Sequence, residues 1–406
     1  MAPKTLRAKK PSGGPARPYE RPPIGQASTP LMKQYLKLKA AHESDVLFFR
    51  MGDFYEMFYE DAALVSRVLG IALTSRGSGR DEYAMAGFPI HALDRYLPRM
   101  ISDGYRVAIC EQVEDAAVAR ENKRIVRREV IEVHTPGTLT DEKLLDAGKT
   151  NFLLALHLPR RNSKLIGLAW FEASSGRFLV ANVGLDQLES ELERIAPAEI
   201  LVTESLARDG EREPSEDGKN AAAHLLAQLK RRAPVAEVPD WVQRPKGALE
   251  ALLERFGVAT LAGLGLDDRA TYVPAANTAL HYVSEKKPGF LENLGRFGRG
   301  IELYRPERHL VLDAATSRCL EITRPLREGS GDAGTLLGAI DRTRTAMGRR
   351  LLREWLLSPL RDPSEIAFRQ DAVAALLKNP GDQEALEAGL RRVYDLERLA
   401  GRVASG

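Results

Sequence analysis

The sequence predicts a multidomain protein in which two α/β domains precede a helical domain. The chain has 406 residues, which is enough for about two to four domains at roughly 100–200 residues each. Strand-like and helix-like segments alternate as far as about Gly265, as they do in α/β folds. After Tyr272 the pattern is almost entirely that of amphipathic helices. With 44% apolar residues, the chain does not have the composition of an intrinsically disordered protein.

The first 27 residues differ in composition from the rest. They contain six lysines and arginines against one glutamate, together with six prolines. We therefore expect residues 1–27 to be a disordered basic tail, which is either simply solvated or a weak tether to polyanions. The net positive charge of this tail is larger than the net charge of the whole chain, which is +3, so residues 28–406 together carry a slightly negative net charge. DNA binding by the folded part would have to come from a local surface.

The segment from Thr29 to about Gly137 is predicted to form the first α/β domain. Thr29 and Pro30 are typical of a helix start, as N-cap and first helical residue. Residues 45–52 are a short apolar run that ends in glycine, which predicts a buried strand. We also expect helices over 62–69 and 92–103 and strands over 71–74 and 105–112.

The next segment predicts a second α/β domain and then the helices. Three strand-like runs separated by turn residues predict an antiparallel meander over 152–158, 165–171 and 178–183. A helix over 185–195, a strand over 199–203 and a polar loop over 208–220 follow, and this domain ends near Gly265. The helices of the third domain are expected over 275–286, 314–323, 335–357, 363–377 and 383–402.

Common catalytic motifs are not supported. Gly148-Lys149-Thr150 resembles the end of a phosphate-binding P-loop, but position 143 is lysine where that loop needs glycine, so we assign the tripeptide to an interdomain linker. The seven histidines and two cysteines lack metal-ligand spacing. We therefore expect no catalytic residue, no metal and no cofactor in this chain. Because there is neither a secretory signal nor an apolar run of about 18 residues, we predict a cytoplasmic protein without membrane segments.

The most informative segment is residues 48–61, Phe-Phe-Arg-Met-Gly-Asp-Phe-Tyr-Glu-Met-Phe-Tyr-Glu-Asp, which permits two interpretations. In the first, Asp53 and Glu56 form a capping box at a helix start, and aromatic residues four apart make ordinary core contacts. In the second, the backbone is still extended at Phe54, where a strand gives way to a helix, so Phe54 and Glu56 project to the same face. An exposed phenylalanine can wedge between base steps. A carboxylate is tolerable beside DNA when it accepts a base N–H, or when it is protonated and donates.

This segment resembles the mismatch-recognition motif of the MutS family of bacterial DNA mismatch repair proteins. Further blocks carry the resemblance in the same order, so that it spans about residues 28–406. They are Pro30-Leu-Met-Lys-Gln-Tyr-Leu, Leu73-Thr-Ser-Arg-Gly, Met85-Ala-Gly-Phe-Pro, Val107-Ala-Ile-Cys-Glu-Gln, Thr135-Pro-Gly-Thr-Leu, Leu312-Asp-Ala-Ala-Thr and Thr345-Ala-Met-Gly-Arg-Arg-Leu-Leu-Arg-Glu-Trp-Leu.

The resemblance implies roles for individual residues. Phe54 would stack on the mispaired base, and Glu56 would form a hydrogen bond to that base. Arg76 and Met85 lie in blocks that approach the DNA in the family.

The basic run 123–128 has a less specific signal. Its Arg124 and Arg128 would contact DNA phosphates, unless the run is only a solvated face. Glu129 and Glu132 follow directly and reduce the local positive charge.

The resemblance also implies a division into domains. Residues 28–137 would be the mismatch-binding domain, 138–149 a linker, 150–262 a connector domain with a ribonuclease-H-like fold, and 272–406 an incomplete helical core or lever domain. The strands of the connector carry only Glu172, at a strand end, whereas two-metal hydrolysis needs several convergent acids. We therefore expect the connector to be structural.

The family's clamp tip, the return half of its lever and its ABC-type ATPase have no counterpart in this sequence. We therefore expect a fragment of a longer protein, with the family's ATP and magnesium bound outside this chain. The resemblance implies binding to double-stranded DNA with mismatches or small loops, formation of a homodimer and docking of a MutL-type partner through the connector. It also implies a cytoplasmic, nucleoid-associated location.

A different class of function stays open from the sequence. Without clamp and ATPase, the chain would be a protein-interaction scaffold whose DNA affinity is too weak to matter. An ATPase is rejected for this chain because the P-loop is absent from the sequence.

Overall fold

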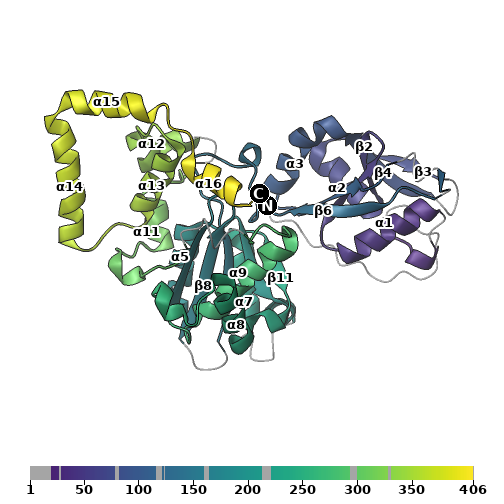
Figure 1. Cartoon of the computed structure of the whole chain (residues 1–406), viewed down its shortest axis with the longest axis horizontal. Helices are drawn as coiled ribbons and strands as arrows, with labels where there is room; N and C mark the ends of the chain where they lie inside the picture. Colours follow the sequence, from purple (N-terminus) through teal and green to yellow (C-terminus); the bar gives the residue numbers. More distant parts are fainter. Residues whose placement is uncertain are drawn as a thin grey trace. The chain divides into compact units, whose positions relative to one another are not determined.

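The computed structural model describes residues 20–26, 29–77, 82–115, 121–122, 124–159, 164–212, 221–292, 300–327 and 331–405 (Figure 1). The chain divides into two compact units, one up to Pro136 and one from Gly137. Most of the predicted basic tail and Lys123 of the basic run lie outside the described residues. Within the described part, no helix combines the length and the apolar character that a membrane crossing requires.

The first unit is built on a six-stranded mixed sheet. Strands β1 and β5 are parallel, and the other neighbouring strands are antiparallel. Gly52 turns the chain from β1 into β2 with a φ of +59°, a backbone conformation that favours glycine. The strands in spatial order are β3 (Thr74–Arg76), β4 (Tyr83–Pro89), β2 (Phe54–Phe58), β1 (Val46–Met51), β5 (Val107–Gln112) and β6 (Arg128–His134).

Among the helices of this unit that the structure describes are α1 (Pro30–Ala41), α2 (Tyr59–Leu69) and α3 (Leu93–Ser102). The predicted start of α1 is confirmed, because the Thr29 side chain accepts a hydrogen bond from the Met32 N–H. Tyr35 of α1 packs edge-on against Phe49 and Phe58, with ring centroids 5.4 Å and 4.9 Å apart.

A buried ion pair joins α1, α2 and the start of β1. Lys39 Nζ lies 2.9 Å from Asp61 Oδ1, and it also donates to the Asp45 carbonyl. The Asp61 carboxylate accepts a hydrogen bond from the Leu47 N–H at 3.0 Å. Both charges are therefore paired and hydrogen-bonded, as charges in a protein interior must be.

Several predicted elements of the first unit are corrected. Strands β4 and β6 were not predicted. The strand expected over 71–74 begins only at Thr74, and the helix expected over 62–69 already begins at Tyr59.

The second unit contains another six-stranded mixed sheet. The predicted antiparallel meander is confirmed as β7, β8 and β9. Strands β10 and β11 extend it in parallel on one side, and β12 pairs in parallel with β9 on the other. In spatial order the strands are β11 (Val235–Val238), β10 (Glu199–Thr203), β7 (Leu153–His157), β8 (Leu165–Glu172), β9 (Arg177–Gly184) and β12 (Ile301–Leu303).

Helices cover both faces of this sheet. Alternate residues of the strands contribute to two hydrophobic cores, as the period of a strand requires. One core contains α8 (Pro245–Phe256) and α9 (Tyr272–Lys286), and the other contains α5 (Leu188–Ile195), α6 (Glu204–Glu211) and α7 (Ala221–Arg232). The loop expected over 208–220 is thus helical as far as Glu211, and residues 213–220 lie outside the described part.

The position of α9 corrects the prediction that a helix over 275–286 opens the helical domain. Its residues Ala275, Ala279 and Val283 are completely buried in a core of the sheet. The chain entering α9 passes directly over β8, where a Cβ at Gly167 would lie 1.9 Å from the Thr271 carbonyl oxygen. Glycine is therefore required at this close approach.

The remaining described chain is mostly helical, as predicted. The helix expected over 314–323 ends at Cys319, however, and those expected over 335–357 and 383–402 are each divided in two. Asp362 caps α14 at the predicted Asp-Pro start, with its side chain accepting from the Ser364 N–H. In the part of this segment that the structure describes, the α-helices are α11 (Ala314–Cys319), α12 (Leu336–Ile340), α13 (Ala346–Leu357), α14 (Pro363–Lys378), α15 (Pro380–Leu390) and α16 (Leu396–Ser405).

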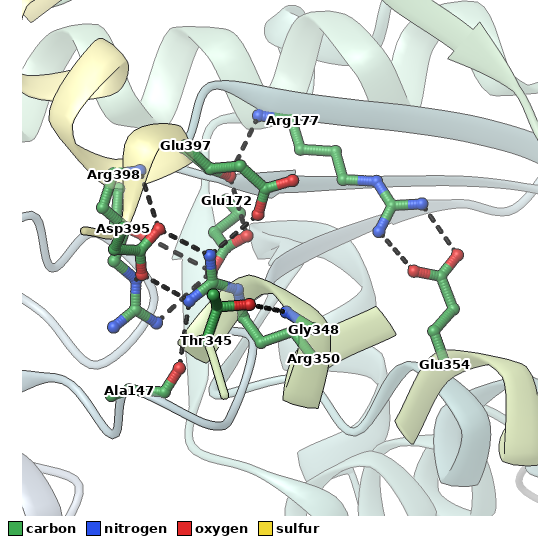
Figure 2. A network of polar contacts seen from close by, with 12 residues as sticks. Ala147, Glu172, Arg177, Thr345, Gly348, Arg350, Glu354, Asp395, Glu397 and Arg398 are labelled. Carbon is green, nitrogen blue, oxygen red and sulfur yellow. Dashed lines mark hydrogen bonds and ion pairs between the residues drawn. The ribbon is translucent and has the colours of Figure 1, made fainter. Parts of the chain in front are cut away.

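Arg350 on α13 is the centre of a polar network in the second unit (Figure 2). Its guanidinium, with 4% of the side chain exposed, donates to Asp395 at 2.6 Å and 2.8 Å and to Glu397 at 2.8 Å. It also donates to the Ala147 carbonyl at 3.0 Å. Arg350 therefore ties α13 to α16 and to the chain that leads into β7.

Arg398 and Arg177 extend this network. Buried Arg398 donates to the Asp146 and Lys149 carbonyls at 3.1 Å and 2.8 Å. Arg177 on β9 forms two hydrogen bonds to Glu354 on α13, at 2.6 Å and 2.8 Å. The stretch that resembles a P-loop is thus held through its backbone by a helix of the same unit.

We predict that Arg350→Met lowers the free energy of unfolding of the second unit by about 3–5 kcal/mol, because Asp395 and Glu397 would keep partly buried charges without their partner. Chemical denaturation measures this change. Arg391→Met is the matched control, because Arg391 pairs with Glu387 in an exposed position and its loss should leave the denaturation midpoint unchanged. An unchanged midpoint for Arg350→Met would show that the network does not stabilise the unit.

The same pair gives an expected pH dependence. Burial raises the pKa of Asp395, but the hydrogen bonds from Arg350 and from the Arg398 N–H outweigh it and hold this pKa below its ordinary value. The stability that Asp395 contributes is therefore present at neutral pH and is lost as the pH falls through the lowered pKa. Acid titration of the denaturation midpoint should show this loss in the wild type and a weaker one in Arg350→Met.

Candidate nucleic-acid interface

Phe54 and Glu56 lie on β2, which begins two residues after the turn at Gly52. Along this strand, exposed Phe54 and partly buried Glu56 alternate with buried Tyr55 and Met57. The second interpretation of the sequence is therefore confirmed for the backbone, because Phe54 and Glu56 project to the same face.

The capping-box interpretation is wrong. Asp53 lies in the turn between β1 and β2, and α2 begins only at Tyr59, with Phe58 as its N-cap residue. Phe54 therefore starts a second strand, whereas we expected it where a strand gives way to a helix.

Phe54 is unusual among the aromatic residues of this unit. Its neighbour Tyr55 packs against Phe48 and Phe88, with ring centroids about 6 Å apart, and is 4% exposed. Phe54 itself is 46% exposed. A large aromatic side chain on an otherwise well-packed strand is thus available for contact with another molecule.

The strand register places the other candidate residues. Residues directly opposite one another on neighbouring strands point to the same face. By this register, one face of the sheet carries Phe54, Glu56, Arg76, Met85 and Arg128.

Glu56 and Arg76 form an ion pair on this face. The closest nitrogen and oxygen atoms are 3.6 Å apart, with 51% of the Arg76 side chain and 18% of the Glu56 side chain exposed. Glu56 Oε2 is buried and has no hydrogen-bond partner among the described residues. Burial raises the pKa of Glu56 above its ordinary value, and the positive charges of Arg76 and Arg128 oppose this rise.

Met85 lies on β4, opposite Phe58 and Thr74. Its side chain is partly buried and packs against the core that contains Phe58. Met85 therefore borders the exposed part of the face and is not itself exposed.

The two arginines of the basic run differ from each other. Arg124 is half exposed and forms an ion pair with Glu114 at 2.6 Å. Arg128 is 8% exposed, and its guanidinium donates to the Arg50 carbonyl at 2.7 Å and to the Gln34 side chain at 3.1 Å. The expected solvent-facing position of Arg128 is therefore wrong, because its donors bind acceptors inside the unit.

Sequence reasoning missed a cluster that fixes the turn between β1 and β2. Arg50 Nη1 lies 3.1 Å from Glu111, which also accepts a hydrogen bond from the Tyr55 hydroxyl. Arg50 Nε donates to the Gly52 carbonyl. The sequence offered no signal for this cluster beyond Gly52 itself as a turn residue, because Glu111 is 61 residues away from Arg50.

The described residues give no support to a metal site. They contain no group of three or more histidine, cysteine, aspartate or glutamate side chains that could hold an ion. Glu172, the one acid of the meander strands considered for nuclease chemistry, is 2% exposed and accepts hydrogen bonds from the Asn151 N–H and the Ser175 hydroxyl.

Comparison with known proteins confirms the resemblance seen in the sequence motifs. The family models MutS domain I, MutS domain II and MutS domain III match residues 29–143, 151–295 and 315–406. The DNA mismatch repair protein MutS of Salinibacter ruber is 43% identical over 382 residues, which cover 93% of this chain and 40% of the relative. The MutS proteins of Myxococcus xanthus and Symbiobacterium thermophilum are 42% and 41% identical to this chain. Each match covers 93% of this chain, and the two matches cover 40% and 41% of the respective relatives.

The chain thus spans about 40% of the length of the curated relatives that it matches. Three successive domain models of one family match in order, and together they account for most of the chain. The chain belongs to the MutS family and contains its domains I, II and III.

Proposed function

We propose that the first unit binds mismatched DNA, with Phe54 entering the distorted base step and Glu56 forming a hydrogen bond to the mispaired base. The observation that carries this proposal is the exposed Phe54 beside the partly buried Glu56 on one face of β2. The relatives are named DNA mismatch repair proteins, which supports the same function.

Phe54 would select mismatches through the deformability of DNA. Unstacking a base step costs roughly a few kcal/mol, and a mispaired step is cheaper to kink than a paired one. A wedge that is already exposed on a fixed strand enters such a step without rearranging the protein. The aromatic side chain therefore favours mismatches without reading a particular base.

Glu56 would act as a hydrogen-bonding group whose charge is adjustable. An ionised carboxylate is repelled by DNA phosphates, whereas a neutral carboxyl group donates a hydrogen bond to a base acceptor. Burial already raises the pKa of Glu56, so the neutral form is more accessible than for an exposed glutamate.

The surrounding residues would position the DNA. We propose that Arg76 and Arg124, both half exposed, contact phosphates. Met85 would lie at the border of the surface that contacts DNA. Arg128 would act indirectly, by holding Arg50 and thereby the turn that precedes Phe54.

The other parts of the chain are assigned by family membership. We propose that residues 28–137 form the mismatch-binding domain. A ribonuclease-H-like connector that docks a MutL-type partner would begin at residue 150 and, because α9 and β12 pack on its sheet, would include both of them. The helices from α11 onward would form the helical core or lever domain. Homodimer formation and the ATP-dependent step, with magnesium, would belong to a longer protein of this family.

We predict that Phe54→Ala removes most of the preference for a G·T mismatch over homoduplex DNA. Stacking on an aromatic side chain contributes about 1–3 kcal/mol per base, which corresponds to a loss of roughly 5- to 150-fold in the affinity for the mismatched duplex. Fluorescence anisotropy with the two duplexes measures the ratio of dissociation constants.

Ile131→Ala is the matched control for this variant. Ile131 lies on β6 and is 55% exposed, so it tests the general loss of an exposed apolar side chain from the same sheet. It should keep the preference for G·T, and an unchanged ratio in Phe54→Ala would rule out the wedge.

We predict that Glu56→Gln retains mismatch binding, because the amide is neutral and donates a hydrogen bond from the same position. Titration with G·T duplex at neutral pH measures the affinity. Complete loss of binding would show that the ionised carboxylate is required.

A protein-interaction scaffold is the second candidate function. Helix α14 exposes large apolar side chains, with Phe368 78% and Leu377 69% accessible, which favours contact with other protein surfaces. The salt dependence of binding to G·T duplex separates the two functions. DNA binding through phosphate contacts falls steeply with salt, whereas a scaffold shows neither that slope nor a preference for mismatches.

A further inference from the structure

The ion pair between Glu56 and Arg76 joins two strands that are not neighbours. Arg76 ends the edge strand β3, Glu56 lies on β2, and β4 runs between them. The residue of β4 directly opposite Glu56 is Gly87, where a Cβ would lie 3.4 Å from Glu56 Cγ and 3.0 Å from the Tyr55 carbonyl oxygen. The absence of a side chain at Gly87 keeps the space beside the Glu56 carboxylate open.

This ion pair is easily broken. Its atoms are 3.6 Å apart, which is beyond a hydrogen bond, and half of the Arg76 side chain is exposed. A DNA phosphate offers the guanidinium two well-placed oxygens, so it competes effectively for Arg76. Glu56 cannot follow, because it lies on a central strand with most of its side chain buried.

We propose that Arg76 changes partner when mismatched DNA binds, so that its guanidinium moves from the Glu56 carboxylate to a backbone phosphate and Glu56 takes up one proton from solvent. This inference rests on the proposed function. The proton binds to a carboxylate oxygen of Glu56, Arg76 keeps its charge, and the neutral carboxyl group donates a hydrogen bond to the displaced base. Arg76 is thus a positioning residue that couples phosphate contact to the protonation of Glu56.

The other groups around Glu56 keep their charge during this exchange. Arg128 on β6 lowers the pKa of Glu56, but its guanidinium is held by Arg50 and Gln34, so its effect is the same with and without DNA. Tyr83 on β4 has a pKa raised above its ordinary value, chiefly by burial, and stays neutral at physiological pH. When Arg76 leaves, a charge that lowers the pKa of Glu56 is replaced by phosphates that raise it.

The test is the pH dependence of binding between pH 5 and 8 at constant salt, with G·T and homoduplex DNA as probes. In the wild type, the affinity for G·T duplex should rise as the pH falls. The rise should occur between the pKa of Glu56 in the bound protein and its pKa in the free protein, and it should reach at most tenfold per pH unit. Glu56→Gln should abolish this dependence. Wild-type preference for G·T without any pH dependence overturns the exchange and leaves the proposed function intact, whereas no preference at any pH overturns the proposed function.

Arg76→Ala distinguishes an exchange from a simple phosphate contact. The variant should show a smaller total change with pH, because the pKa of Glu56 is already higher in the free protein. Its salt dependence, the slope of log K against log salt, should be smaller by about 0.9. A smaller salt slope with an unchanged pH dependence would show only a phosphate contact, and an unchanged salt slope would show that Arg76 stays on Glu56. Either result overturns the proposal.

Two controls complete the design. Arg124→Ala removes another half-exposed arginine, which pairs with Glu114, and should leave the pH dependence unchanged. Carboxyl-carbon NMR of the free protein reports the titration of Glu56 directly. Its pKa should rise in Arg76→Ala and return towards the wild-type value in Arg76→Lys, and an unchanged pKa in Arg76→Ala overturns the coupling.

Discussion

Burial of Tyr55 and Met57 is the constraint on which the geometry of β2 depends. Both side chains are almost completely buried, and in a strand their neighbours must then point the other way. Phe54 and Glu56 are therefore held on one face by core packing that involves neither of them. A shift of the strand by one residue would turn Tyr55 and Met57 outward and Phe54 and Glu56 inward, which would bury the Glu56 carboxylate in the core. The register of β2 is therefore strongly specified.

The same burial gives Glu56 its chemistry. A carboxylate in the middle of a sheet loses part of its hydration, which raises its pKa, and the nearby arginines limit this rise. The ionised form costs some stability in the folded protein, since folding favours the neutral form. Under the proposed function, this cost would be the counterpart of a carboxyl group that is able to donate a hydrogen bond beside DNA.

Some of this organisation could be predicted from the sequence, because it depends on local patterns. The cap at Thr29 and the meander follow from residue types that are close together in the chain. Strand β2 was ambiguous, since Phe54 and Phe58 are four positions apart, as on one face of a helix, whereas Phe54 and Glu56 are two apart, as on one face of a strand. The interior position of Arg128 could not be predicted, because its acceptors Arg50 and Gln34 lie 78 and 94 residues away. Helix α9 has an apolar pattern that fits packing on a sheet as well as packing in a helical domain.

The arginines and the pair on β2 would contribute differently to discrimination. In the free protein, Arg76 and Arg124 are each paired with a glutamate, and the folded chain is slightly acidic without its tail. For Arg124, the proposed contact with phosphates would require breaking its ion pair on homoduplex and mismatched DNA alike, so it would cancel from the ratio of the two affinities. Under the proposed function, stacking by Phe54 and protonation of Glu56 would depend on a step that opens, so they would not cancel. Preference for a mismatch would then come from one aromatic and one acidic side chain, with Arg76 assisting by leaving Glu56, while Arg124 would set an affinity that is common to both kinds of DNA.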